Sequence, residues 1–138
     1  GIAWIGQWEI EKGVIYAVPK NQKIDTSIEI HHPMQVKQIV ESGERLVIDA
    51  RFREFYDMGH IPGALSWPLS DFEANPEKFI SKIEKNKPIL VYCSGLECTD
   101  SHNMANQLIR MGYSDVKVFS GGYNEWAAIG FDIKKNEN

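Results

Sequence analysis

The chain has very little cysteine, and this limits how it can be held together. It contains two cysteines in 138 residues, Cys93 and Cys98. Two are too few for a disulfide-rich scaffold. A four-ligand zinc site would need two of the four histidines to converge on them, so we expect no metal site. The cysteine count leaves the cellular compartment open.

The sequence also lacks long apolar runs and concentrated positive charge. No stretch approaches the ~18 apolar residues that a membrane-spanning helix needs, and the start does not have a signal-peptide pattern. The net charge is -4 and the basic residues are scattered. We therefore expect neither a nucleic acid nor, within this chain, a membrane as a partner.

The first residues carry a separate hypothesis about the cellular setting. The chain begins with Gly1 and an apolar stretch that includes Trp4, Ile5 and Trp8. This stretch raises the hypothesis that a membrane segment lies upstream in a longer protein. We expect a membrane-tethered domain if the chain is an excised piece, and a cytoplasmic protein if it is complete.

What the sequence does have is an alternation of strand and helix patterns. Apolar runs at residues 46–49 and 89–92 are typical of strands buried on both faces of a parallel sheet. Residues 116–119 are a third strand candidate, and residues 64–67 are a weaker fourth. Amphipathic patterns predict helices over residues 33–41, 53–56, 75–85, 101–112 and 121–131. The alternation predicts an α/β fold with a mostly parallel sheet and helices on both faces.

The two ends of the chain fit this alternation less well. Residues 14–18 and 28–30 are candidate edge strands, and we interpret residues 1–27 as a segment that wraps around the domain. We place the domain itself at residues 28–133 and expect the polar residues 134–138 to be frayed.

Two of the predicted helices have recognisable ends. Asn75 is the expected N-cap of one, with Pro76 in its first turn. Asp100 or Ser101 is the expected N-cap of the helix that follows the cysteines, and Gly112 is expected to end it in a left-handed conformation.

Cys93 stands directly between a predicted buried strand and a predicted helix. Reactive groups of α/β folds gather at the carboxyl ends of the strands, and the positive end of a helix favours a thiolate over a thiol. The small residues Ser94 and Gly95 would let the backbone curl around the sulfur. The residues alone leave two interpretations open, a reactive nucleophile and a buried structural cysteine.

Four motifs carry a resemblance to a known family. Asp49 and Arg51 follow one strand, GHIPGA covers residues 59–64, ILVYC covers residues 89–93, and SGGYNEW covers residues 120–126. In this order and spacing they resemble the rhodanese-like (sulfurtransferase) domain family, over residues 28–133. The resemblance implies a five-stranded, mostly parallel sheet flanked by helices.

The resemblance also implies a chemistry for the site. Cys93 would accept a sulfane sulfur as a persulfide and pass it to a thiophilic acceptor. The donor would be thiosulfate, a polysulfide or a protein persulfide, and no cofactor is needed. Asp49 and Arg51 would form a structural ion pair near the site. His60 would be a structural hydrogen-bonding residue, because persulfide transfer needs a thiolate more than a separate base.

The loop after Cys93 departs from the family pattern. Its residues are Ser94, Gly95, Leu96, Glu97, Cys98, Thr99, Asp100 and Ser101. Members of the family often carry arginines here, but this loop has none and holds two acidic residues. The backbone amides of residues 96–101, the helix end and His102 would have to stabilise an anion. We therefore expect weak use of thiosulfate. Phosphatase chemistry is disfavoured. Phosphatases of similar fold have an arginine six residues after the cysteine that binds the phosphate, and in this chain that position is Thr99.

Cys98 has two interpretations that the sequence leaves open. It would resolve a persulfide or sulfenate on Cys93 by forming a disulfide, or it is a buried filler without a partner. The main prediction is thus a sulfurtransferase that works through Cys93. The alternative is a redox or sulfur-sensing module that uses the Cys93 and Cys98 pair, and a further one is a binding domain without catalysis.

Overall fold

A parallel β-sheet forms the centre of the protein. The computed structural model describes residues 26–136. Within them the strands are β1 (Glu29–Ile30), β2 (Leu46–Asp49), β3 (Leu65–Ser66), β4 (Ile89–Tyr92) and β5 (Val116–Phe119). They form one five-stranded sheet in the order β1-β5-β4-β2-β3, and each neighbouring pair is parallel. The predicted α/β class with a parallel sheet is confirmed.

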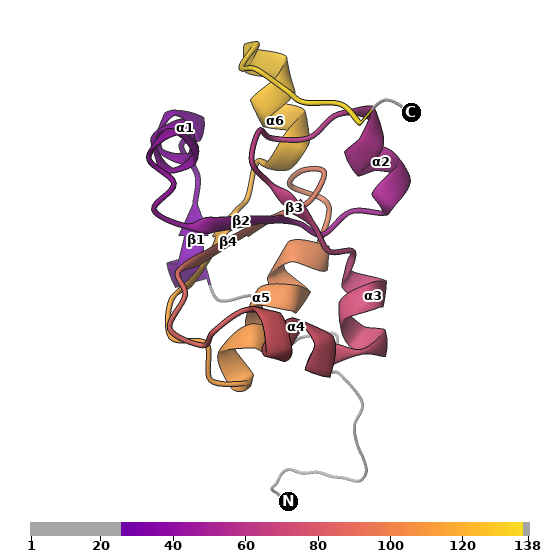
Figure 1. Cartoon of the computed structure of the whole chain (residues 1–138). Coiled ribbons are helices and arrows are strands. Elements are labelled where there is room, and N and C mark those ends of the chain that lie inside the picture. Colours follow the sequence, from indigo (N-terminus) through magenta and orange to yellow (C-terminus); the bar gives the residue numbers. More distant parts are fainter. Residues whose placement is uncertain (1–25, 137–138) are drawn as a thin grey trace, which may run out of the picture.

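Helices cover both faces of this sheet (Figure 1). They are α1 (Pro33–Ser42), α2 (Arg53–Met58), α3 (Leu69–Ala74), α4 (Pro76–Lys82), α5 (Asp100–Arg110) and α6 (Gly122–Ile129), and a short 3-10 helix, η1 (Thr26–Ile28), precedes β1. Figure 1 shows α1 and α6 on one side of the sheet and α3, α4 and α5 on the other. No helix within residues 26–136 is long and apolar enough to cross a membrane.

The core is divided by the sheet into two apolar layers. Val36 and Ile39 of α1 and Trp126 of α6 pack on one face. Phe79 of α4 and Leu108 of α5 pack on the other. The central strand β4 is buried at every position, because both of its faces contact a layer of helices. The chain leaves β4 at its carboxyl end, and the predicted nucleophile follows there.

Some predicted elements differ from the observed ones. α3 was not predicted, and its buried Phe72 shows why it forms: this short helix covers the same apolar layer as α4. α4 ends at Lys82 instead of residue 85, because Ile83 adopts an extended backbone. The predicted strand over residues 28–30 is observed as β1. The predicted strand over residues 14–18 lies outside the described residues, as does most of the wrapping segment, 1–27.

The C-terminal end is held in place further than we predicted. The backbone of Lys134 forms an antiparallel bridge with His60, and the backbone N–H of Asn136 donates to the carbonyl of Asp57. The expectation of fraying is therefore wrong for these two residues, because both have backbone partners around α2. Residues 137–138 lie outside the described part of the chain.

Candidate active site

Cys93 follows β4 directly and is almost completely buried, with 1% of its surface exposed. The loop after it leads into α5, which begins at Asp100. The cysteine thus lies at the carboxyl end of the sheet and faces a helix N-terminus, as predicted.

Backbone contacts from α6 fix the start of this loop. The N–H of Tyr123 donates to the Cys93 carbonyl at 2.9 Å, and the N–H of Asn124 donates to the Ser94 carbonyl at 2.8 Å. Gly122 makes this approach possible: its φ is +63°, and a Cβ there would lie 2.5 Å from the Cys93 carbonyl oxygen. This contact explains the glycine at position 122 of the SGGYNEW motif, because only glycine fits against the Cys93 backbone there.

Cys93 and Cys98 form a disulfide, with their Cα atoms 6.3 Å apart. The loop closes because the Cys98 N–H donates to the Gly95 carbonyl at 3.0 Å. Cys98 is therefore not a buried filler without a partner, and that alternative is wrong. The same hydrogen bond removes the Cys98 amide from the set that we expected to stabilise a persulfide.

The N-cap of α5 is Thr99, not Asp100 or Ser101 as predicted. Thr, Asp and Ser are all favoured at the N-cap, so residue type alone does not tell which of the three neighbouring residues is the N-cap. The consequence concerns Ser101, which lies inside the first turn with its Oγ 3.3 Å from the Cys93 sulfur. A hydroxyl at this distance can donate to a thiolate.

A buried polar network stands beside the cysteine at the end of β2. The Arg51 guanidinium donates to both Asp49 carboxylate oxygens and, through Nη2, to the Gly59 carbonyl. The Tyr92 hydroxyl donates to Asp49 Oδ2 at 2.7 Å and accepts from the Ile61 N–H at 3.1 Å. Asp49 is fully buried, so these donors replace the water that its charge would otherwise need.

This network shifts the pKa values of its members. Burial, followed by the charge of Asp49, raises the pKa of Tyr92, so its hydroxyl stays protonated and remains a donor. Burial lowers the pKa of Arg51, but the hydrogen bond and the charge of Asp49 outweigh burial, and the net shift is upward. The ion pair expected for Asp49 and Arg51 is present in the structure.

His60 and His102 both have hydrogen-bond partners outside the cysteine loop. His60 Nδ1 donates to the Tyr56 carbonyl at 2.7 Å, and its ring stacks on the Tyr56 ring. His102 binds the Glu29 carboxylate of β1 at 2.7 Å, so the expectation that His102 would balance the acidic loop residues is wrong. Within residues 26–136 no three His, Cys, Asp or Glu side chains are placed to hold a metal ion.

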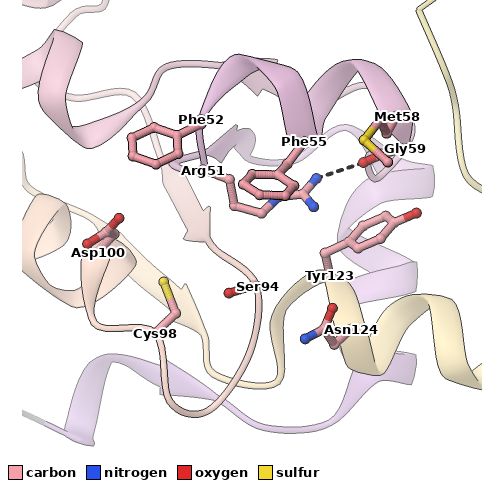
Figure 2. A pocket seen from close by; sticks show the side chains of 10 residues that line it. All are labelled: Arg51, Phe52, Phe55, Met58, Gly59, Ser94, Cys98, Asp100, Tyr123 and Asn124. Carbon is pink, nitrogen blue, oxygen red and sulfur yellow. Dashed lines mark hydrogen bonds between the residues drawn. The ribbon is translucent and has the colours of Figure 1, made fainter.

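An open cleft of about 470 Å³ lies next to the disulfide (Figure 2). Its lining residues are Arg51, Phe52, Phe55, Met58, Gly59, Ser94, Cys98, Asp100, Tyr123 and Asn124. Cys98 lines this cleft, whereas Cys93 is buried and does not line it. Of the other predicted loop residues, Gly95, Leu96 and Glu97 line a neighbouring hollow of about 500 Å³ that shares Ser94, Cys98 and Asn124 with the cleft.

The sequence did not point to the aromatic part of this cleft. Phe52, Phe55 and Met58 recur every third residue, a pattern that is also typical of a helix face packed on the core. In the structure all three are exposed and line the cleft. Their exposure depends on where α2 lies, which the local sequence does not show.

The chain matches a family model and several known proteins. The family described as "Rhodanese-like domain" matches residues 32–129. The chain is 28% identical over 95 residues to "Thiosulfate sulfurtransferase GlpE" of Coxiella burnetii, which covers 69% of this chain and 83% of that protein. It is 27% identical over 127 residues to "Uncharacterized protein YibN" of Escherichia coli, which covers 91% of this chain and 82% of that protein.

A solved structure gives the same result for the fold. The chain superposes on the solution structure of the rhodanese-like domain of Alr3790 from Anabaena sp. with a TM-score of 0.64 and 30% identity. The superposition covers 75% of this chain and 76% of that one.

Proposed function

The chain belongs to the rhodanese-like domain family, and we propose that it is a sulfurtransferase that carries sulfane sulfur as a persulfide on Cys93. The observation that carries this proposal is the position of the Cys93 sulfur, between the end of β4 and the first turn of α5, with Ser101 Oγ 3.3 Å away. Support also comes from the Coxiella burnetii relative, which is named a thiosulfate sulfurtransferase.

The reaction takes two displacements at sulfur. The Cys93 thiolate attacks the sulfane sulfur of the donor, the S–S bond of the donor breaks, and the leaving group departs with the bonding electron pair. The outer sulfur of the Cys93 persulfide is then attacked by a thiophilic acceptor, and Cys93 leaves as a thiolate. The partial positive charge at the start of α5 and the Ser101 hydroxyl favour this thiolate in both steps.

The disulfide has to be reduced before Cys93 can accept sulfur. Cys98 is partly exposed and lines the cleft, whereas Cys93 is buried. An incoming thiol therefore reaches the Cys98 sulfur, and Cys93 is the leaving group. This direction is favourable, because the thiolate that leaves is the one that the helix end stabilises.

The disulfide also favours a second candidate function, a redox or sulfur-sensing module. In this case the two cysteines would alternate between dithiol and disulfide and retain no sulfur. The observation for it is the Cys93–Cys98 bond itself. Both candidates use the same two residues, so they are distinguished by whether Cys93 retains a transferable sulfur atom.

Intact mass spectrometry of the reduced protein separates the two candidates. Incubation with thiosulfate or polysulfide should add one sulfur atom to the wild-type chain and to Cys98→Ser, and none to Cys93→Ser. Cyanide should remove the added sulfur. A loss of two hydrogens that requires both cysteines, with no sulfur retained, would instead establish the redox module and exclude the carrier mechanism.

A further inference from the structure

The cleft has an apolar wall that persulfide chemistry by itself does not need. This apolar ridge consists of Phe52, Phe55 and Met58, which are 59%, 51% and 70% exposed. Phe55 and Met58 are three positions apart in α2, so they project from neighbouring positions on this helix, and Phe52 is its N-cap residue. Figure 2 shows the ridge facing Ser94 and Cys98 across the cleft. Three large apolar side chains left in water beside a cysteine loop indicate a surface for a ligand.

The charges around the cleft do not suit a dianion. Among the described residues, Arg51 is the one cationic side chain that lines the cleft, and its guanidinium is already bound to the Asp49 carboxylate. Asp100 adds a second carboxylate. One cation and two carboxylates leave a net negative charge, which repels thiosulfate because thiosulfate carries two negative charges.

The remaining side of the cleft is also aromatic. Tyr123 places its ring 4.3 Å from the Arg51 guanidinium and covers it. The ligand therefore meets aromatic faces on two sides, from the apolar ridge and from Tyr123. A cleft of about 470 Å³ has room for an aryl group together with its reactive sulfur.

We propose that this cleft binds an organic sulfane-sulfur donor with an apolar body and a single negative charge, in preference to thiosulfate. This inference rests on the proposed function, because the donor matters only if Cys93 accepts its sulfur. The apolar body lies against the ridge. Once the disulfide is reduced and the Cys98 side chain has moved away from the cleft wall, the terminal sulfur reaches the Cys93 thiolate beside Ser94. With a thiosulfonate donor, the S–S bond breaks and a sulfinate leaves with the electron pair, so no oxidant or reductant is consumed.

Two donors with the same reactive group and different bodies test this inference. Reduced protein is mixed with benzenethiosulfonate or methanethiosulfonate, and the second-order rate of sulfur addition to Cys93 is measured by intact mass. Phe55→Ala should lower the rate with benzenethiosulfonate about tenfold, because an apolar contact of this size discriminates by that order. Met58→Ala should lower it in the same direction. Both variants should react with methanethiosulfonate at nearly the wild-type rate.

A matched control uses an exposed apolar residue away from the cleft. Ile129 is 49% exposed at the end of α6 and does not line the cleft. Ile129→Ala should therefore react with both donors like the wild type. Thiosulfate is the third donor. The rate of each donor with wild-type Cys93 is divided by the rate of the same donor with a free small thiol. This relative rate should be lower for thiosulfate than for either thiosulfonate.

The outcomes distinguish this inference from the proposed function. If no donor adds sulfur to Cys93, the proposed function fails and the inference fails with it. If all donors add sulfur but Phe55→Ala slows both thiosulfonates equally, or neither, only the inference is overturned. A dimer in solution that Phe55→Ala dissociates would assign the ridge to a second copy of the chain and would also overturn it.

Discussion

The carboxyl ends of β2 and β4 are neighbours in the sheet, yet they hold their buried polar groups in opposite ways. Asp49 of β2 is fully buried, and both of its oxygens accept hydrogen bonds from Arg51 or Tyr92. Cys93 after β4 is 1% exposed, and it is held by a covalent bond to Cys98. The partners of Asp49 are fixed, whereas the partner of Cys93 is exchangeable by thiol chemistry.

This difference shows that burial alone does not tell a structural group from a reactive one. Both groups are buried and both are polar or ionisable. The two groups differ in their partners. Arg51 and Tyr92 form hydrogen bonds to the Asp49 carboxylate, whereas the bond between Cys98 and Cys93 can be reduced by a thiol that enters the cleft. We therefore expect changes at the end of β2 to act on stability, and changes at the end of β4 to act on chemistry.

Asp49→Ala tests the structural side of this comparison and should have the largest effect. It leaves the Arg51 charge buried without its partner, which we expect to lower the free energy of unfolding by about 3–5 kcal/mol. Urea unfolding of the reduced protein measures this. Glu41→Ala is the control, because it breaks the exposed pair between Lys37 and Glu41 and should leave stability close to that of the wild type. Equal effects of the two variants would contradict the comparison.

Gly122→Ala tests whether the cysteine backbone depends on the close approach of α6. The added Cβ meets the Cys93 carbonyl, and alanine is strained at a φ of +63°. Together these effects should cost roughly 3 kcal/mol of stability and slow sulfur addition to Cys93. Gly63→Ala is a matched control, because its φ is +84° but nothing lies within 4 Å of the added atom. If both variants add sulfur equally fast, the contact with α6 does not position the cysteine.

The elements that carry this comparison were predictable from local sequence. β2 and β4 are short apolar runs rich in branched residues, and β5 alternates Val116 and Val118 around Lys117. Runs of four residues with this composition favour a buried strand over a helix. Asn75 and Pro76 marked the start of α4 because capping and a proline in the first turn both act locally. The position of Cys93 at the carboxyl edge followed from the strand before it and the helix after it.

The details of the site depend on contacts that the local sequence does not contain. The disulfide forms because the loop is curled by a turn at Gly95 and held by α6, which is distant in sequence. A spacing of five residues permits such a bond but does not require it. The exposure of Phe55 and the turn of His102 toward Glu29 likewise depend on how α2, α5 and β1 pack.

Reduction of the disulfide is the mildest change, and it tests whether the end of β4 can be altered without loss of the fold. The bond closes a short loop, so its removal should lower the free energy of unfolding by only about 2 kcal/mol. Urea unfolding with and without a reductant measures this difference in the wild type, and Cys98→Ser should abolish it. The reduced protein should stay folded, because the network around Asp49 and both apolar layers do not involve the cysteine pair. A reduced protein that unfolds without denaturant would make the disulfide a structural bond and would remove the distinction between the two strand ends.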